Sequence, residues 1–445
     1  MFKILHLSDI HLGSGFSHGY LNPKTGLNTR LEDFVLALTR CIDRAIEEPV
    51  DLVLFGGDAF PDATPLPYIQ ELFATQFRRL VDAQIPTVLL VGNHDQHRQG
   101  QGGASLSIYR TLGVPGFVVG DRLETHTIPT AQGMIQVVTL PWLTHSTLVT
   151  RPEMEGLSFS EVGHQLLDRL RIALEAEIRL LDPNLPHILL GHAMIDTAQY
   201  GAERFLAVGK GFSLPLSFIA RPCFDYVALG HVHRHQCLCT SPPVVYAGSI
   251  ERVDFSEELE EKGFVLVNLD RGQADVQFIS LPARPFKTIR VDVSQSENPQ
   301  LDLLQTIEMS SISNAIVRLL YKIQPRQLSL LDDRLLHEAL KSAHSYSIQG
   351  ELVSQLATPR LPELGEGQHL SPLEALETYL DRREDLKSLR VDLLNAAQAL
   401  LDDRIAPKTI APPGSTPDRL PPTVAEFSAT YTLSSSSSEQ QLRLL

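Results

Sequence analysis

The chain has few cysteines and no long apolar run. Its 445 residues include four cysteines and one tryptophan, and the two neighbouring cysteines, Cys237 and Cys239, lack the usual spacing of a zinc site. We therefore expect all four cysteines to be reduced, which argues against a disulfide-stapled secreted domain. No apolar run is long enough to span a membrane, and no basic-then-apolar leader precedes the first expected strand. These absences predict a cytoplasmic protein with no membrane partner.

An excess of positive charge is also lacking. The chain carries 53 acidic and 38 basic residues, a net charge of −15, which argues against nonspecific nucleic-acid binding by a uniformly basic surface. A nucleic-acid enzyme stays open, because bound divalent ions add local positive charge and basic residues can gather on one face. The length alone predicts two or three domains.

The first part of the chain alternates expected strands with expected helices. Apolar runs predict strands at residues 2–7, 51–55 and 87–91, and apolar stripes predict intervening helices at residues 31–46 and 69–80. This alternation favours an α/β fold, in which sites form beyond the carboxyl ends of the strands. Further on, we expect a second sheet that contains the apolar runs 244–249, 264–269 and 276–281.

The rest of the chain divides by composition. Residues 284–357 alternate strand-like runs with one helical stretch near 335–343, which predicts a small α/β domain. A linker rich in proline and glycine at 358–367 precedes an expected helical segment at 368–404. The stretch 361–405 holds ten acidic and five basic residues, so we expect it to contact a protein rather than DNA; an intramolecular helical hairpin is the alternative. Residues 405–445 are rich in proline and serine and are expected to be disordered.

Polar side chains follow five expected strands, the first three above and two more at residues 188–190 and 226–229. They are Asp9 and His11, Asp58, Asn93 and His94, His192, and His231 and His233. In extended backbone, residues i and i+2 point the same way, so we expect Asp9 and His11 to converge on one ion. Each piece alone is commonly a polar turn or a core histidine, but five pieces in this order are difficult to obtain by chance.

Aspartate, asparagine and histidine together suit manganese, iron or zinc, and the set is large enough for two ions. One aspartate can bridge both ions through its two oxygens, and two such ions can clamp a phosphate and activate a water. Asp95 is expected to fix the ring of the neighbouring His94. His97 is kept as a candidate substrate contact, and Trp142 is expected in the core or in a wall of the site.

The motifs resemble those of the calcineurin-like metallophosphoesterase superfamily. They are Asp9-x-His11, Gly57-Asp58, Gly92-Asn93-His94-Asp95, Gly191-His192 and Gly230-His231-x-His233. The resemblance implies a four-layer α/β/β/α sandwich over residues 1–283, followed by a small α/β cap domain and C-terminal helices. Within the superfamily, residues 6–13, 201–204 and 224–233 resemble the SbcD-type DNA double-strand-break repair nucleases.

The resemblance also implies a role for each site residue. One metal would be held by Asp9, His11, Asp58 and His233, and the other by Asp58, Asn93, His192 and His231. His94 would stabilise the transition state and protonate the leaving oxygen. The two ions are expected to be manganese. At Pro61 some members of the family carry a polar residue that meets the phosphate, so this departure leaves the cleavage polarity open.

The function implied is that of a metal-dependent DNA nuclease subunit in DNA repair and recombination, both a double-strand exonuclease and a single-strand endonuclease. The cap at 284–357 would bind DNA, the segment 368–404 would bind an SbcC-type, SMC-like ATPase, and the chain would form a homodimer. One alternative is a metallophosphodiesterase acting on a small or cyclic nucleotide, against which the additional domain argues. The other is a non-catalytic DNA-end scaffold, against which the complete ligand set argues.

Overall fold

The structure is a computed structural model that describes residues 1–97, 103–143, 159–201, 213–353 and 372–405, except for 382, 384, 385, 387 and 388. The chain divides into two compact units, Met1–Gln355 and Leu356–Leu445. The linker expected at 358–367 and nearly all of the tail expected at 405–445 lie outside the described residues. In the part of the chain that is described, no helix is long and apolar enough to cross a membrane.

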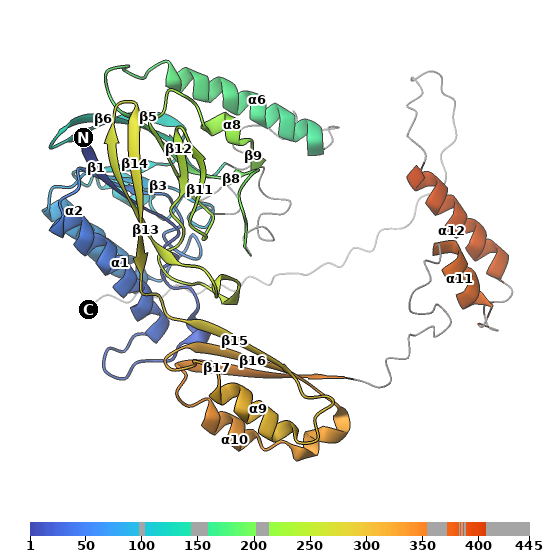
Figure 1. Cartoon of the computed structure of the whole chain (residues 1–445). Coiled ribbons are helices and arrows are strands. Elements are labelled where there is room, and N and C mark those ends of the chain that lie inside the picture. The colour runs from blue at the N-terminus through green and yellow to red at the C-terminus, as the bar shows by residue number, and fades with distance from the viewer. Residues whose placement is uncertain are drawn as a thin grey trace, which may run out of the picture. The chain divides into compact units, whose positions relative to one another are not determined.

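Two six-stranded sheets form the body of the first unit (Figure 1). The first has the spatial order β14 (Gln273–Leu281), β13 (Lys262–Asp270), β1 (Phe2–Leu7), β2 (Leu52–Phe55), β3 (Thr87–Leu90) and β4 (Phe117–Gly120). The second has the order β11 (Gln236–Thr240), β12 (Pro243–Tyr246), β10 (Tyr226–Gly230), β7 (His187–His192), β6 (Gly133–Leu140) and β5 (Glu124–Thr130). The central strands of both sheets run parallel, so their carboxyl ends share one edge.

Helices cover the outer face of each sheet. The first sheet packs against α1 (Thr29–Glu47), α2 (Pro67–Asp82) and α3 (Ser107–Thr111), and the second against α6 (Phe159–Ile178) and α8 (Leu216–Ile219). A short pair of strands, β8 (Met194–Ile195) and β9 (Ser213–Leu214), lies apart from both sheets in the hydrogen-bonding pattern. Three apolar cores result: one under each helix layer and one between the sheets. The four-layer α/β/β/α sandwich is therefore confirmed.

The sequence pattern misplaced two strands and missed others. We expected the runs 264–269 and 276–281 in the second sheet, but they form β13 and β14 of the first sheet. The reason is that β13 pairs antiparallel with β1, with Phe2 opposite Leu269 and His6 opposite Val265. This pairing joins segments about 260 residues apart, so no local periodicity reveals it. The strands β4 and β5 were not predicted.

A small domain of three parallel strands completes the first unit. Its strands are β15 (Phe286–Asp292), β16 (Ile316–Ile323) and β17 (Ser345–Leu352), and its helices are α9 (Pro299–Glu308), η3 (Pro325–Leu330) and α10 (Asp333–Ala339). The helices α9 and α10 cover one face of this sheet and share an apolar core with it (Figure 1). The helix expected at 335–343 is α10, whereas α9 was not predicted.

The second unit contains two helices, α11 (Pro372–Leu380) and α12 (Arg390–Ile405), where one helical stretch was expected. They contact each other, and Arg390 forms ion pairs with Glu377 at 3.0 Å and Asp381 at 2.9 Å. Leu389, Val391 and Leu393 nevertheless stay exposed, with 48%, 66% and 38% of their surface accessible. The helix pair therefore presents apolar side chains to its surroundings.

Candidate metal centre

Left-handed backbone turns deliver the candidate ligands. Asp9, His11, Asp58 and His231 have φ angles of 52°, 46°, 58° and 99°, and they make up four of the six non-glycine residues with positive φ in the described part of the chain. We expected Asp9 and His11 to converge from extended backbone, but β1 has already ended at Leu7. Side chains rarely tolerate this conformation, and such residues cluster at functional sites. The turns are held by hydrogen bonds from Asp9 N to Gly57 O and from His11 N to Asp58 O, both 3.0 Å.

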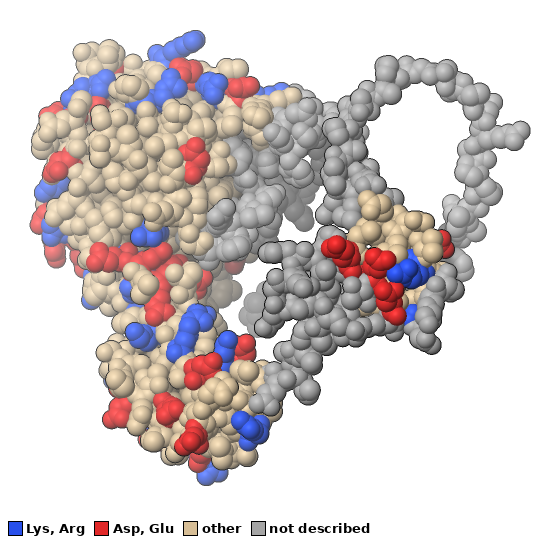
Figure 2. Space-filling view, turned by 45° about the vertical axis from the view of Figure 1, so that its right-hand side comes forward, with Lys and Arg blue, Asp and Glu red and all other residues tan. Residues whose placement is uncertain are grey.

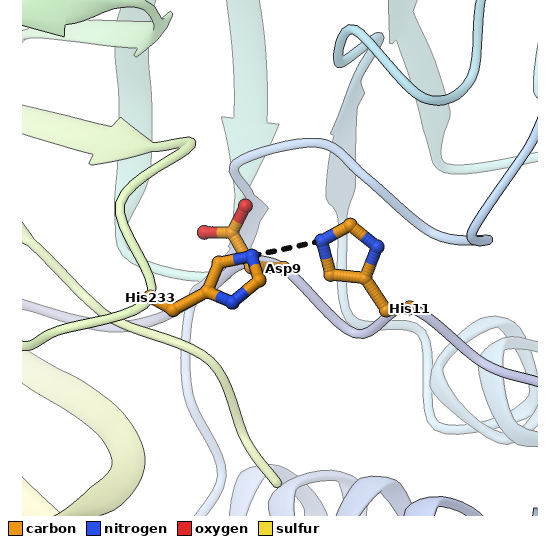
Figure 3. A group of neighbouring side chains, drawn as sticks. All are labelled: Asp9, His11 and His233. Carbon is orange, nitrogen blue, oxygen red and sulfur yellow. Dashed lines mark hydrogen bonds between the residues drawn. The ribbon is translucent and has the colours of Figure 1, made fainter. Parts of the chain in front are cut away.

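The first group of candidate ligands is Asp9, His11 and His233, which come from two distant parts of the chain (Figure 3). The Nε2 atoms of His11 and His233 lie 3.0 Å apart. The Asp9 carboxylate accepts hydrogen bonds from Ser8 Oγ at 2.7 Å and from His231 N at 3.0 Å. All three side chains are buried, so a charge placed here would be poorly solvated unless these groups compensated it.

Asp58, His192 and His231 form the second group, and Asn93 lies among them. Asn93 Oδ1 is 3.0 Å from His192 Nε2 and 2.9 Å from His231 Nδ1. The other ring nitrogen of His192, Nδ1, donates to Gly56 O at 2.7 Å. This bond fixes the ring so that Nε2 faces the site.

Asp58 lies between the two groups. Its Oδ2 atom is 3.6 Å from His11 Nε2 and 3.4 Å from His192 Nε2, whereas Oδ1 accepts a hydrogen bond from His94 N at 2.8 Å. Asp58 is therefore placed to contribute a ligand to both groups. Burial opposes ionisation of Asp58, but His192 and the other histidines beside it hold its pKa well below its usual range.

The ionisation of the other ligands follows from burial and from Asp58. Burial lowers the pKa of the His11 and His231 rings well below the usual value, so both rings are neutral at pH 7. Burial raises the pKa of Asp9. Burial also lowers the pKa of His192, but the neighbouring Asp58 carboxylate outweighs this effect and raises the pKa to about 9. Metal ligation requires neutral imidazole and ionised carboxylate, so binding an ion here would release protons.

The spacing of these atoms fits two divalent ions. Ligand atoms at about 2.1 Å from one ion and at right angles to each other lie about 3 Å apart. Asn93 Oδ1 has this spacing from His192 Nε2 at 3.0 Å and from His231 Nδ1 at 2.9 Å. The Nε2 atoms of His11 and His233 have it as well, at 3.0 Å. Two imidazole nitrogens 3.0 Å apart can form at most one hydrogen bond, whereas both can direct lone pairs at one cation. The mixture of nitrogen and oxygen donors suits manganese, iron or zinc.

His94 is oriented by a backbone oxygen, a contact that the sequence pattern does not indicate. Its Nδ1 donates to the backbone oxygen of Pro61 at 2.8 Å, because a carbonyl can only accept. The His94 ring stands edge-on to His11, with 4.9 Å between the ring centres. His94 also lies close enough to His11 and Asp58 to count geometrically as a third group of candidate ligands. Pro61, which has no polar side chain, thus contributes to the site through its backbone oxygen.

Asp95 does not fix the His94 ring, contrary to our expectation. Its carboxylate accepts hydrogen bonds from the backbone N–H groups of Gly92 and Asp58, both at 2.9 Å, and of Ala59 at 3.1 Å. Asp95 is completely buried. It therefore joins the loops after β2 and β3, which carry Asp58 and Asn93.

Three further residues, Trp142, His97 and Glu257, differ in their relation to the site. Trp142 is buried, and its ring centre lies 4.7 Å from that of His231, which places it in a wall of the site as expected. His97 is exposed, and in the described part of the chain it does not join the ligand groups. Glu257 was not predicted: its Oε1 lies 2.7 Å from His233 Nδ1. An acidic residue 24 positions after its partner gives no recognisable spacing in the sequence.

Comparisons with known proteins find a matching family model and several similar proteins. The family model, described as calcineurin-like phosphoesterase, matches residues 2–235, more than half of the chain. The chain is 27% identical over 291 residues to the SbcD subunit of the nuclease SbcCD of Staphylococcus epidermidis, an alignment that covers 65% of this chain and 71% of that protein. A Thermus thermophilus protein of solved structure aligns over 62% of this chain and 98% of its own, with 14% identity and a TM-score of 0.35. A dimetal phosphatase from Danio rerio covers the same shares, with 12% identity and a TM-score of 0.37.

Proposed function

Because this chain belongs to the calcineurin-like phosphoesterase family, we propose that it is a metal-dependent DNA nuclease subunit that works in DNA repair and recombination in the cytoplasm. The observation that carries the proposal is the convergence of Asp, Asn and His donors from five loops into two adjoining groups. The relative in Staphylococcus epidermidis, which is named as a nuclease subunit, supports a nucleic acid as the substrate.

Two Mn²⁺ ions are the cofactors in this proposal. Asp9, His11, Asp58 and His233 would hold one ion, and Asp58, Asn93, His192 and His231 the other. When bound, such a pair polarises the phosphate, lowers the pKa of a water and stabilises the leaving oxygen. All of these ligands except the half-buried Asn93 are buried, which limits the access of bulk water and strengthens electrostatic interactions with the phosphate.

His94 is the proposed catalytic residue beside the ligands. Its Nδ1–H is engaged by Pro61 O, so Nε2 is the ring nitrogen available to the substrate. A proton on Nε2 would stabilise negative charge that develops on the phosphate and would pass to the leaving oxygen. The hydrogen bond from His94 N to Asp58 Oδ1 fixes the backbone of His94 relative to the ligand Asp58.

The small domain and the helix pair would supply the contacts with macromolecules. In the proposal, residues 284–357 form the DNA-binding cap, and residues 368–404 bind an SbcC-type, SMC-like ATPase. Exposed Leu389, Val391 and Leu393 on the helix pair support a protein contact. The relative in Staphylococcus epidermidis is named as one subunit of a nuclease, which supports the existence of a partner subunit. We also propose that the chain works as a homodimer.

Single-turnover cleavage of end-labelled duplex and single-stranded DNA tests the proposal, with and without Mn²⁺ and with and without the ATPase. We expect Mn²⁺-dependent cleavage that Asp58→Asn abolishes. Turnover of cyclic nucleotides with no cleavage of DNA would instead favour the small-substrate phosphodiesterase. Absence of any cleavage by the wild-type chain would overturn the nuclease proposal and favour a scaffold.

A further inference from the structure

A connecting segment, residues 251–262, lies between the candidate ligand His233 and the small domain. It belongs to the connection from β12 to β13, ends at the first residue of β13, and contains the short helix η2 (Phe255–Glu257). One side of the segment contacts His233, and the other contacts β15 and β16. Acidic and basic side chains gather together where the small domain meets the body (Figure 2). The segment is therefore the physical connection between the small domain and one ligand of the metal centre.

Toward the metal centre, the contact is made by a buried ion pair. Glu257 Oε1 is 2.7 Å from His233 Nδ1, and Glu257 Oε2 is 2.7 Å from Lys262 Nζ. Only 3% of Glu257 and 1% of Lys262 is accessible. Lys262 Nζ also donates to the backbone oxygen of His233 at 3.2 Å. Both the ring and the main chain of His233 are thus held by this pair.

The pair determines which nitrogen of His233 faces the ligands. Glu257 Oε2 forms an ion pair with Lys262 Nζ at 2.7 Å, so Glu257 is a carboxylate. A carboxylate only accepts hydrogen bonds, so His233 Nδ1 carries the proton and donates it. Nε2 is then left to face His11 Nε2 at 3.0 Å. A carboxylate in this position orients a metal-binding histidine and increases its basicity.

Toward the small domain, three contacts hold the same segment. The guanidinium of Arg318 on β16 lies 4.3 Å from the ring centre of Phe255. The backbone N–H of Thr288 on β15 donates to Glu258 Oε2 at 3.0 Å. The Phe255 ring also meets Phe286 edge-on, with 4.9 Å between the ring centres. Residues on both sides of Glu257 in the sequence are therefore fixed by the small domain.

Arg252 joins the connecting segment to the start of the small domain. Its guanidinium donates to the backbone oxygens of Glu257 at 3.1 Å and Glu260 at 2.6 Å. It also donates to the backbone oxygen of Arg284 at 3.2 Å, where the chain enters the small domain. Arg284 in turn pairs with Asp33 of α1, with both N–O distances at 2.6 Å. A displacement of the small domain would pull on the backbone of Glu257 through these bonds.

We propose that Glu257 is a positioning residue for His233 and that the connecting segment makes the geometry of the metal centre depend on the position of the small domain. The inference rests on the proposed metal-binding function. Its consequence is that a macromolecule that binds the small domain would change Mn²⁺ affinity without touching a ligand. Such coupling is reciprocal, so occupation of the metal centre would also change the affinity of the small domain for that macromolecule.

Mn²⁺ titration of the full-length chain by calorimetry, with the free ion followed by electron paramagnetic resonance, tests the proposal. We expect Glu257→Gln to weaken one of the two Mn²⁺ sites by about 10–100-fold. The double variant Glu257→Gln/Lys262→Met removes both members of the buried pair, so neither charge stays buried without the other. Glu260, whose Oε2 lies 2.8 Å from Lys262 Nζ, also loses this ion pair, but it is only half-buried. Arg318→Ala should weaken the same site about fivefold, the change expected when a cation–π contact is lost.

Two matched controls separate the connection from general charge effects. Glu261→Gln neutralises an exposed acid in the same segment, and Arg290→Ala removes an exposed cation from the same face of the small sheet as Arg318. Both should keep two sites of wild-type affinity. Wild-type affinity in the double variant or in Arg318→Ala would overturn the inference. Failure of the unmutated chain to bind two ions would overturn the proposed function instead.

Discussion

Asn93 and His94 are neighbours in the chain, but their side chains have different partners. Asn93 Oδ1 meets the rings of His192 and His231, whereas the His94 ring is bound to Pro61 O. We therefore expect Asn93→Ala to weaken Mn²⁺ binding. His94→Ala should keep two bound ions and reduce the single-turnover rate by about 10²–10⁴-fold, the usual contribution of a positioned acid. Calorimetry measures the ions, and cleavage of labelled DNA measures the rate.

The control for this pair is His97→Ala, which changes an exposed histidine outside the ligand groups. It should leave both ion binding and cleavage unchanged. Loss of one ion in His94→Ala would contradict the assignment, because it would make His94 a ligand, as its distance from His11 and Asp58 geometrically permits.

Asp95 provides a second test at the level of single residues. Its carboxylate satisfies three buried N–H groups, and an amide in its place has only one accepting oxygen. Asp95→Asn should therefore lower the free energy of unfolding by about 1–3 kcal/mol for each N–H group left without a partner. Urea denaturation measures this change. Asp82→Asn, which affects an exposed ion pair with Arg78, should change stability by less than about 1 kcal/mol; an equal loss in both variants would refute the role of Asp95.

The identities of the candidate ligands could be predicted from the sequence, but their supports could not. Polar residues after apolar strands are visible in a linear pattern. Pro61 acts through a carbonyl oxygen that every residue has, so its side chain gives no signal. Glu257 meets His233 only because the connecting segment folds back. Asp95 was identified, but its partners are backbone N–H groups that no side-chain pattern indicates.

At the level of strands, the site depends on the close approach of two sheets. A Cβ atom on Gly230, at the end of β10, would overlap the backbone oxygen of Gly56 at the end of β2. Gly230→Ala should therefore push these strand ends apart and separate His231 and His192 from Asp58. We expect weaker Mn²⁺ binding at the second ion and a lower melting temperature.

Gly163→Ala is the matched control, because a Cβ atom there meets nothing within 4 Å and the residue lies in α6. Alanine favours a helix over glycine by up to about 1 kcal/mol, so this variant should be at least as stable as the wild type. Mn²⁺ calorimetry and thermal unfolding compare the two. Unchanged ion binding in Gly230→Ala would show that the strand ends can separate without disturbing the ligands.

The strands themselves show which parts of a fold a sequence reveals. The strands β1, β2 and β3 with α1 and α2 follow local periodicity, and all five were predicted. The strand β13 is placed by its pairing with β1, which is far from it in the sequence. The local pattern therefore assigned β13 to the wrong sheet. The edge strand β5 is largely exposed on one side and mixes polar with apolar residues, so its pattern is weak.

For the whole molecule, the division into two units predicts where metal binding resides. Every candidate ligand lies within Met1–Gln355, and so do its hydrogen-bond partners that are described above. A chain shortened to residues 1–355 should therefore bind two Mn²⁺ ions with unchanged affinity. It should fail to capture the ATPase partner, because the apolar surface of α11 and α12 is gone. Calorimetry and a pull-down against the full-length chain measure these two properties.

Chelation provides the last test, because a ligand that binds only the folded state stabilises it. At a free concentration 100 times its dissociation constant, each ion adds about 2.7 kcal/mol to the free energy of unfolding. Removing Mn²⁺ should therefore lower the melting temperature of the full-length and shortened chains by equal amounts, since the same unit carries the ligands. Ca²⁺, which prefers oxygen donors, should restore less stability than Mn²⁺ at a centre rich in imidazole. A shift seen only in the full-length chain would place a ligand in residues 356–445 and contradict the assignment.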